Sequence, residues 1–409
     1  MIVPAGEAPT KGYLTAVAWL AAQRRDGRPR SPALALELFG RLGRPDLAFP
    51  TVRVLGTNGK GSVCAMLDAG LQVEHASVGR FTSPHLEDFS ERITVGGKPV
   101  SPGFVTQFVQ AAQGWPRAAF FDLTLAMACE WFRLRSVDLA VIEAGVGGGS
   151  DATSALPPSR LTVITNVGHD HLATIGPGLL DVAREKAGGI SPGAPTVTAA
   201  TGAALAIVRR DAAARGSQVY ALEDGDRLFD LPRAPRLGGA HQLENAALAA
   251  AALRLLGSAE PSVNAALAAS WPGRFERIPW EFSPGLKVTV VLDGAHNQEA
   301  AEALTASLPP GFLLVFGVMA RKDWRRVIVP LAAKAEGVIV TWPGEGGLDP
   351  HIAAEEFGFE VQPFLPLALQ EAARRAGDGG LVVVAGSLYL VGAARSWLRS
   401  AGASVGVAA

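Results

Sequence analysis

The residues from Gly56 to Ser62 have the types and the spacing that could bind phosphate groups. They read GTNGKGS, follow the apolar run Thr51–Leu55 and precede a helix-like stretch that starts near Val63. In such an arrangement of strand, turn and helix, backbone N–H groups and the helix N-terminus can hold phosphate oxygens. The Lys60 ammonium would reach the outer phosphates as a point charge, and the Ser62 hydroxyl could ligate Mg²⁺. The segment therefore predicts a nucleoside triphosphate site, for which the candidate residues are Gly56, Thr57, Asn58, Gly59, Lys60, Gly61, Ser62 and Val63.

The spacing of this loop departs from that of the common P-loop. Val54 stands where the first glycine of that loop belongs, and Gly61 separates Lys60 from Ser62. The alternative interpretation is a turn that binds no ligand, which is the usual meaning of a few glycines after a strand. The asparagine, lysine and serine among the glycines favour phosphate binding, and the unusual spacing narrows the choice of family.

Further candidates follow other strand-like runs, where ligands of open parallel sheets bind. The run Val137–Ile142 ends in Glu143, and the run Leu161–Thr165 leads into His171. A carboxylate at this edge suits Mg²⁺, which binds one or two carboxylates together with phosphate oxygens and water. Lys186 follows in a helical segment. Taken singly, each residue could be an ordinary solvated side chain, and their joint occurrence is what indicates a site.

Composition limits the classes of protein and partner. A chain of 409 residues exceeds what one hydrophobic core usually supports, so we expect two domains. Because 48% of residues are hydrophobic and the net charge is −1, we expect neither disorder nor a nucleic acid partner. Cys64 and Cys129 are isolated, which indicates small buried side chains in a cytoplasmic protein. The first residues lack a leader pattern, and Leu381–Ala394 is too short to span a bilayer, so we expect no membrane attachment.

The chain reads as an α/β protein in which strands and helices alternate. Strand-like runs that are apolar throughout indicate a mostly parallel sheet with helices on both faces. After the stretch Pro279–Gly285, which contains Pro and Gly, the pattern restarts. We therefore expect one domain over residues 1–284 and a second over residues 285–409. The strand-like runs of the second domain are Val288–Leu292, Phe312–Phe316, Gly337–Thr341 and Leu381–Ala385.

These segments and several others resemble, in order, the folylpolyglutamate synthase and dihydrofolate synthase family of Mur-type ATP-dependent ligases. The matching stretches are GTNGKGS, TSPHL from Thr82, EAGVGGGSDAT from Glu143, HQLENAALAA from His241, PGRFE from Pro272, LDGAHN from Leu292, FGVMARKD from Phe316 and VVAGSLYLVG from Val383. The resemblance covers roughly residues 10 to 400. It implies an N-terminal three-layer P-loop ATPase domain, a smaller Rossmann-like C-terminal domain and a nucleotide site shared between them.

The resemblance also implies a reaction. ATP would phosphorylate the carboxylate of dihydropteroate or of a tetrahydrofolyl-polyglutamate, and the amine of L-glutamate would attack the acyl phosphate. A carboxylate is a poor electrophile, whereas an acyl phosphate offers a good leaving group. The phosphoryl transfer depends on positioning and on neutralisation of charge. The implied partners are therefore ATP, L-glutamate and a folate or pteroate, in a chain expected to be a monomer.

The roles of residues in phosphoryl transfer are likewise implied by the resemblance. Ser62 and Ser83 would ligate a first Mg²⁺, and Glu143 and His171 a second. Lys186 matches a lysine that relatives carry as a carbamate, which converts a cation into an anion. The residues expected to act in catalysis are Lys60, His171 and Lys186.

Later motifs imply contacts with the rest of the nucleotide. Asn245 would contact the adenine side, Arg274 the phosphates and Asp293 the ribose, with His296 beside them. The chain carries extra residues around Pro279–Leu286, which we interpret as a longer hinge between the domains. Closure of the domains would exclude water from the acyl phosphate.

The folate side is predicted from two segments. In the first, the TSPHL loop offers Ser83, Pro84 and His85, and Phe121 is a candidate to stack on the pterin ring or, alternatively, a core residue. In the second, Asp151 could accept hydrogen bonds from the amino group and ring N–H of the pterin. The residues implied by this second segment are Ser150, Asp151 and Ala152.

Two departures from the family pattern GGRxDATN leave an alternative open. Gly149 replaces the arginine, which removes a planar and permanently charged donor, and Ser154 replaces the asparagine. The chain could therefore be a paralogue that binds nucleotide or folate without ligation, or one with altered specificity. The stretch Arg24–Leu38 also lacks the segment expected near the pterin. A peptidoglycan Mur ligase would bring a separate domain ahead of the phosphate loop, for which a loop starting at Gly56 leaves little room.

Overall fold

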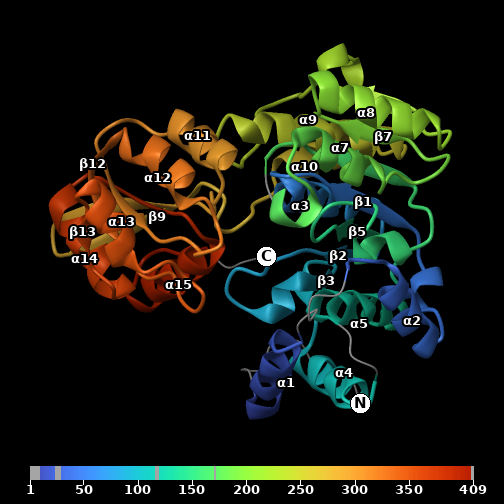
Figure 1. Cartoon of the computed structure of the whole chain (residues 1–409), viewed down its shortest axis with the longest axis horizontal. Helices are drawn as coiled ribbons and strands as arrows, with labels where there is room; N and C mark the ends of the chain where they lie inside the picture. The colour runs from blue at the N-terminus through green and yellow to red at the C-terminus, as the bar shows by residue number, and fades with distance from the viewer. Residues whose placement is uncertain (1–9, 24–28, 116–118, 170–171, 407–409) are drawn as a thin grey trace. The chain divides into compact units, whose positions relative to one another are not determined.

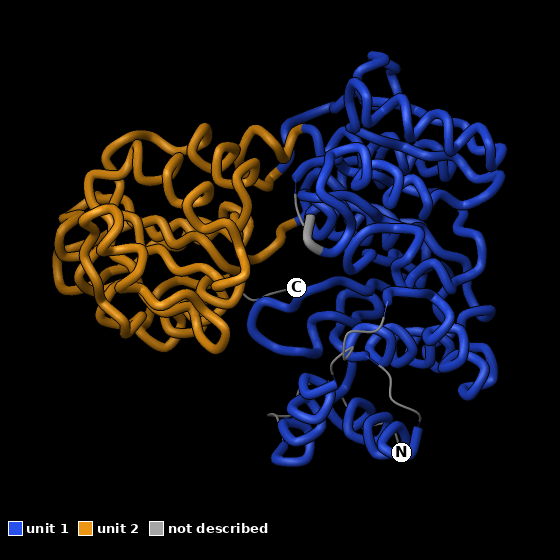
Figure 2. Tube along the Cα trace, in the orientation of Figure 1, with its two compact units in different colours: residues 1–235, 244–269 blue, residues 236–243, 270–409 orange. Residues whose placement is uncertain are grey.

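The chain forms two compact units in a computed structural model that describes residues 10–23, 29–115, 119–169 and 172–406 (Figures 1 and 2). Unit 1 consists of Met1–Pro235 and Glu244–Ala269, and unit 2 consists of Arg236–Leu243 and Ser270–Ala409. Within the described residues, no helix is long and apolar enough to cross a bilayer.

Unit 1 is built on an eight-stranded sheet with the order β4-β3-β2-β5-β1-β6-β7-β8. In this order, the neighbours from β2 through β5, β1, β6 and β7 to β8 pair in parallel. At the other end of the sheet, β3 pairs antiparallel with both β2 and the edge strand β4. Residues of the central strands are buried throughout, as helices on both faces require. The strands are β1 (Thr51–Leu55), β2 (Val78–Phe81), β3 (Ile93–Val95), β4 (Lys98–Pro99), β5 (Leu139–Glu143), β6 (Leu161–Ile164), β7 (Thr196–Thr198) and β8 (Val219–Ala221).

Helices surround this sheet. The helices of this part of the chain are α1 (Lys11–Ala21), α2 (Ala33–Arg41), α3 (Lys60–Leu71), α4 (Pro102–Ala112), α5 (Phe120–Leu134), α6 (Leu172–Ile175), α7 (Leu179–Ala187), α8 (Gly202–Ala213), α9 (His241–Leu255) and α10 (Glu260–Leu267). Helix α3 contacts β1, β2, β5 and α10, whereas α5 contacts β2, α1 and α2. Local signals explain several helix starts, since Thr10 caps α1 and Ser101 followed by Pro102 caps α4.

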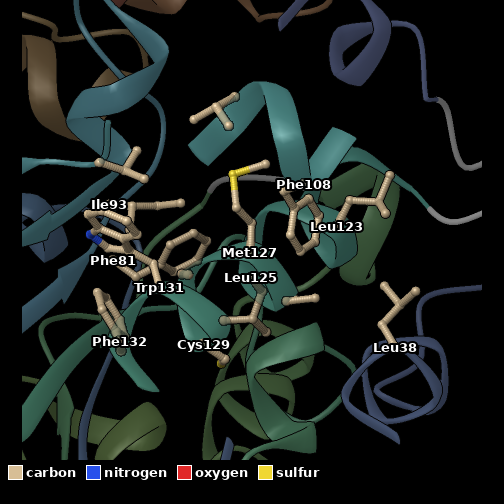
Figure 3. Packing of buried hydrophobic residues seen from close by; sticks show 14 of the residues in the cluster. Leu38, Phe81, Ile93, Phe108, Leu123, Leu125, Met127, Cys129, Trp131 and Phe132 are labelled. Atoms are coloured by element: carbon tan, nitrogen blue, oxygen red, sulfur yellow. The ribbon is translucent and has the colours of Figure 1, made fainter. Parts of the chain in front are cut away.

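A large hydrophobic cluster of unit 1 gathers around α5. Figure 3 shows Leu125, Met127 and Phe132 of this helix among the side chains of the cluster, with Phe81 from the end of β2 close by. Both cysteines are buried and free, which confirms their interpretation as small core side chains. Burial raises the pKa of the Cys64 and Cys129 thiols well above the ordinary value. The core therefore fixes α5 and the carboxyl ends of β2 and β5, which carry site residues.

Unit 2 has a six-stranded sheet with the order β13-β12-β11-β14-β10-β9, parallel except for the edge strand β9. Its strands are β9 (Glu276–Ser283), β10 (Leu286–Leu292), β11 (Phe312–Phe316), β12 (Ala335–Val340), β13 (Glu360–Val361) and β14 (Leu381–Ala385). Its helices are α11 (Gln298–Ser307), α12 (Trp324–Ala332), α13 (Pro350–Phe357), α14 (Leu365–Ala376) and α15 (Leu388–Ser400). The two sheets confirm the α/β class expected from the sequence.

The chain divides earlier than the sequence pattern predicted. The expected boundary near residue 285 falls at Gly285, in the turn of the β9–β10 hairpin, where its φ is 80°. Pairing runs from Ser283 opposite Leu286 to Glu276 opposite Leu292, so both strands belong to the sheet of unit 2. The extra residues interpreted as a longer hinge form this hairpin instead.

Candidate active site

The glycine-rich loop connects β1 to α3, as the sequence predicted, and two of its glycines have no room for a side chain. Gly56 has φ 143°, and a Cβ there would lie 1.8 Å from the Thr165 Oγ1. Gly59 has φ 84°, and its Cβ would lie 2.1 Å from the Asn245 Oδ1. These positive φ values and close approaches explain why glycine is needed. Asn245, predicted to contact the nucleotide, thus lies directly against the loop.

The segment that follows β6 holds the loop in place. Asn58 N donates to Asn166 Oδ1 at 2.9 Å, and Thr57 N donates to the Asn166 carbonyl at 3.1 Å. Thr165 Oγ1 donates to the Asn58 carbonyl at 2.5 Å, and Gly168 N donates to Thr57 Oγ1 at 3.0 Å. Thr165 and Asn166 were missed as site residues. Their position directly after a strand of the same parallel sheet was the signal that could have found them.

The charged and hydroxyl groups of the loop lie at the start of α3. Lys60 Nζ donates to the carbonyls of Gly56 and Thr57, at 3.1 Å each, so the ammonium is folded over the loop itself. Ser62 and Val63 are buried in the first turn of the helix, and Gly61 is partly buried. A cation above a loop of backbone amides is an arrangement that suits an anion such as phosphate.

Two of the four predicted metal ligands come together. Ser83 N donates to Glu143 Oε2 at 3.0 Å, across the carboxyl ends of the neighbouring strands β2 and β5. Glu143 is buried, with 4% of its surface exposed. The predicted ligand and catalytic residue His171 lies outside the described residues. In the described part of the chain, no group of three or more His, Cys, Asp and Glu side chains could hold a metal ion by itself.

The loop after β2 contains His85, a predicted substrate contact. Arg92 Nε donates to His85 Nδ1 at 2.8 Å, and the Arg92 guanidinium also lies over the Phe120 ring, 4.9 Å from its centre. Burial and then the positive charge of Arg92 lower the pKa of His85 to about 4. The imidazole is therefore neutral near pH 7. Pro84 beside it is exposed and follows a cis peptide bond.

Phe121 has the core contacts that one of its two interpretations predicted. Its ring centre lies 5.5 Å from that of Phe81, and it packs against the main cluster of unit 1 while only partly buried. A Cβ on Gly145 would lie 2.8 Å from the Phe121 ring, so glycine is required there by close approach. Stacking of Phe121 on a pterin remains a prediction.

Asp151 holds the loop after β5, which we define as residues 146–154 and call the β5 loop. Oδ1 accepts from Thr153 N and Oγ1 at 3.0 and 2.7 Å, and Oδ2 accepts from Val146 N and Arg30 Nη2 at 3.0 Å each. Asp151 is fully buried, and Ala152 is nearly so. A carboxylate has about four acceptor sites. The predicted contact of Asp151 with a pterin would therefore require one of these donors to move.

Glu185 and Arg53 complete the support of the β5 loop. Glu185 Oε1 accepts from Gly148 N, Ser150 N and Ser150 Oγ at 3.1, 2.8 and 2.6 Å. The Ser154 hydroxyl accepts from Arg53 at 3.0 Å and donates to the Gly148 carbonyl at 2.6 Å. Arg30, Arg53 and Glu185 were not among the predicted site residues, although Glu185 stands beside the predicted Lys186. Lys186 is itself buried, with 3% of its surface exposed.

Three predicted residues of unit 2 gather around Gly294. A Cβ on Gly294 would lie 2.2 Å from Arg274 Nη1, and the Gly294 carbonyl lies 2.8 Å from His296 Nδ1. Asp293 Oδ2 accepts from Phe275 N at 2.8 Å, and Asp293 Oδ1 accepts from the Ala295 amide at 2.9 Å. Asp293 therefore supports the backbone here, and its contact with a ribose remains a prediction.

Comparison with known proteins agrees with this arrangement of motifs. The family model "Mur ligase, glutamate ligase domain" matches residues 273–388. A dihydrofolate synthase/folylpolyglutamate synthase of Bacillus subtilis is 32% identical over 370 residues, which cover 80% of this chain and 84% of the relative. A probable bifunctional folylpolyglutamate synthase/dihydropteroate synthase of Haloferax volcanii is 33% identical over 89% of this chain, which spans only 48% of that relative.

A solved structure extends the likeness to the fold. Folylpolyglutamate synthase of Mycobacterium tuberculosis, crystallised with ADP and AMPPCP, is 28% identical to this chain, with a TM-score of 0.81. The match covers 94% of this chain and 99% of that one. The ordered motifs, the paired sheets and these similarities lead to one conclusion. The chain belongs to the folylpolyglutamate synthase and dihydrofolate synthase family.

Proposed function

We propose that this protein ligates L-glutamate to a folate-type carboxylate, with ATP converted to ADP and phosphate. The carboxylate would be that of dihydropteroate, of a tetrahydrofolyl-polyglutamate, or of both. The observation that carries the proposal is the glycine-rich loop between β1 and α3, with the Lys60 ammonium 3.1 Å from two of its carbonyls. Family membership supplies the class of reaction.

The first step is phosphorylation of the acceptor carboxylate. The amides of the loop and the Lys60 ammonium would neutralise the charge that spreads over the transferred phosphoryl oxygens. Arg274 would bind phosphate oxygens in the same way. The amine of L-glutamate then attacks the acyl carbon, and phosphate leaves. No covalent intermediate with the protein is needed.

Mg²⁺ is the proposed cofactor, and the residues present fit it. Glu143 and the hydroxyls of Ser62 and Ser83 are oxygen donors, the type that Mg²⁺ prefers, and the Glu143 carboxylate already lies beside Ser83. We assign Ser62 and Ser83 to one ion, and Glu143 and His171 to another. When bound, Mg²⁺ would neutralise phosphate charge. The buried Lys186 is the proposed carbamate.

The proposed substrate contacts lie on two loops of unit 1. Ser83, Pro84 and His85 would face the folate, together with Phe121. On the β5 loop, Ser150 is half-buried and its hydroxyl donates to Glu185. This hydrogen bond holds the loop in its conformation. We therefore expect the loop as a whole, rather than the Asp151 carboxylate alone, to shape the pterin site.

Release of ADP that depends on glutamate tests the proposal. The purified chain is supplied with ATP, Mg²⁺ and L-glutamate, and with dihydropteroate or tetrahydrofolate as the acceptor. We expect at least one acceptor to stimulate ADP release, and a side-by-side comparison of the two would separate the two activities. If neither acceptor stimulates ADP release while ATP still binds, the ligase proposal fails.

The alternative of a binding protein without ligase activity was motivated by Gly149 and Ser154. The contacts of the β5 loop argue against it. Ser154 bonds both Arg53 and the Gly148 carbonyl, and Arg30 supplies a guanidinium to the same loop. The loop is thus ordered without the arginine and asparagine of the family pattern. Intact mass spectrometry would test the carbamate on Lys186, and gel filtration would test the expected monomer.

A further inference from the structure

Arg274 of unit 2 presents a cation that lies close against the backbone. It lies in the tight turn that precedes β9, is partly buried, and its guanidinium packs against Gly294. Among the described residues, the guanidinium has no hydrogen-bond or ion-pair partner. A partly buried guanidinium is a rigid, permanently charged donor that suits a bidentate anion. Such a group loses less conformational entropy on binding when its orientation is fixed beforehand.

The backbone on both sides of Arg274 is held by carboxylates. Glu276 Oε2 accepts from Gly273 N, and Asp293 Oδ2 accepts from Phe275 N, both at 2.8 Å. Phe275 has φ 48°, a left-handed conformation that a bulky residue adopts only when its surroundings impose it. The turn over residues 273–276, which we call the Arg274 turn, is therefore held against its local preference.

Glu276 is in turn held by a residue far along the chain. Arg395 Nε donates to both oxygens of Glu276, at 3.0 Å each, and Arg395 Nη2 donates to the Gly406 carbonyl at 2.6 Å. Arg395 lies on α15 and is 1% exposed. A single chain of contacts thus leads from α15 through Glu276 to the amide of Gly273, the residue before Arg274. All of these residues belong to unit 2.

We propose that Arg395, acting through Glu276, is a positioning residue for Arg274 in the binding of the ATP phosphates. This inference rests on the proposed function for the identity of the anion. Loss of the Arg395 cation frees Glu276 to turn away from Gly273, and the Arg274 turn then relaxes toward the ordinary backbone conformation of Phe275. The Arg274 guanidinium loses its orientation without being altered itself. The competing explanation is a buried ion pair that only stabilises the fold.

A double-mutant cycle on nucleotide binding separates these explanations. Affinity for a non-hydrolysable β,γ-methylene ATP with Mg²⁺ is measured by calorimetry for the full chain and for Arg274→Ala, Arg395→Gln and the double variant. We expect Arg274→Ala to weaken binding about tenfold or more, as loss of a charge-assisted contact does. Arg395→Gln should weaken binding severalfold alone, yet change it by less than about twofold when Arg274 is already absent.

Two further variants test whether weaker nucleotide binding results only from loss of the fold. Glu276→Gln keeps an oxygen that can accept from Gly273 N but loses the charge that holds Arg395, so it should repeat the Arg395→Gln pattern more weakly. Arg375→Gln breaks an exposed ion pair with Glu360 in the same unit, and should leave binding unchanged. Thermal unfolding midpoints of all variants are measured in parallel.

The outcomes are distinct. An Arg395→Gln effect that vanishes in the Arg274→Ala background supports the positioning role. The same effect in both backgrounds, a lower unfolding midpoint with unchanged nucleotide affinity, or a wild-type chain that does not bind the nucleotide would overturn it. Nucleotide affinity can be measured without turnover. If Arg395 and Arg274 prove coupled in nucleotide binding while glutamate does not stimulate ADP release, only the proposed reaction is contradicted.

Discussion

The β5 loop of unit 1 and the Arg274 turn of unit 2 are supported in the same way but differ in what they leave for a ligand. In both, an aspartate from a predicted motif accepts backbone amides instead of facing outward. In the β5 loop, the Arg30 guanidinium is bonded to Asp151. In the Arg274 turn, the guanidinium of Arg274 is left without a partner in the described structure. In both places a motif carboxylate shapes the backbone, and in the Arg274 turn a neighbouring cation is left for the proposed anion.

The two loops also differ in how their buried cations are compensated. Arg53, 5% exposed, is bonded to a carbonyl and to hydroxyls, and burial lowers its pKa to about 10, against the opposing effect of Asp151. It therefore stays protonated at pH 7. Arg395 is buried but bonded to both oxygens of Glu276. Asp151 offsets the burial of Arg53 through its charge and also pairs directly with Arg30, so its removal should affect two cations.

The largest effect is expected from a substitution in the glycine-rich loop, outside both the β5 loop and the Arg274 turn. Lys60→Met removes the only proposed charge on the loop that reaches the outer phosphates, and we expect turnover to fall by about 10²–10³-fold. Steady-state ADP release measures it, with nucleotide affinity as a second readout. Lys98→Met, on the exposed edge strand β4, is the matched control and should retain full activity. Normal turnover in Lys60→Met would remove the phosphate loop from the proposed mechanism.

The next largest effect is expected from replacing Asp151 of the β5 loop, compared with Asp293 beside the Arg274 turn. Asp151→Asn loses the charge beside Arg30 and Arg53, so we expect the β5 loop to be destabilised by about 3 kcal/mol, the cost of breaking a buried ion pair. Asp293→Asn keeps one acceptor for a backbone amide and should cost about 1 kcal/mol. Hydrogen exchange at residues 146–154 and 273–276 measures both.

Equal losses of protection in the two loops would show that the buried cations do not make the difference. Loss of ligase activity in Asp151→Asn with unchanged exchange would instead support the original prediction that Asp151 contacts the pterin. Arg30→Gln serves as the matched variant, because it leaves the Asp151 charge in place while removing its ion-pair partner.

Local patterns predicted many of the elements and the place of the glycine-rich loop between β1 and α3, because each depends on a short run of residues. The strand Thr51–Leu55 and the helix that starts at Lys60 follow from an apolar run, a glycine-rich turn and a helical pattern. The domain boundary was placed too late because Pro279 and Gly285 resembled a linker. In the structure, Pro279 lies on the edge strand β9, one of the few places where a sheet tolerates proline.

The contacts that build the site could not be predicted in the same way, because they join distant parts of the chain. Arg30 bonds Asp151 across 121 positions, and Arg395 bonds Glu276 across 119. No periodicity or spacing encodes such a pair, since the partner is decided by tertiary packing. The sequence therefore indicated which loops carry the carboxylates, whereas the hydrogen-bond partner of each carboxylate is known only from the structure.

A dependence on pH should appear through His85 of unit 1. Its pKa is lowered from 6.5 to about 4, so between these values the unfolded chain binds more protons than the folded chain. The free energy of unfolding should therefore fall as pH is lowered through this window, by at most about 3 kcal/mol. Urea unfolding followed from pH 7 to pH 4.5 measures the slope. His85→Gln, which can still accept from Arg92, should flatten this slope, and an unchanged slope would assign it to other groups.

The smallest expected effects are on the free energy of unfolding, when one serine hydroxyl is removed from each unit. Ser154→Ala removes a group that accepts from Arg53 and donates to Gly148, so we expect a loss of about 1–2 kcal/mol from the free energy of unfolding. Ser387→Ala removes only the cap of α15, which accepts from Tyr389 N at 3.2 Å, and should cost about 0.5–1 kcal/mol. Urea unfolding with hydrogen exchange assigns each loss to its unit. If Ser387→Ala proved the more costly of the two, the greater sensitivity expected near the buried Arg53 cation would be contradicted.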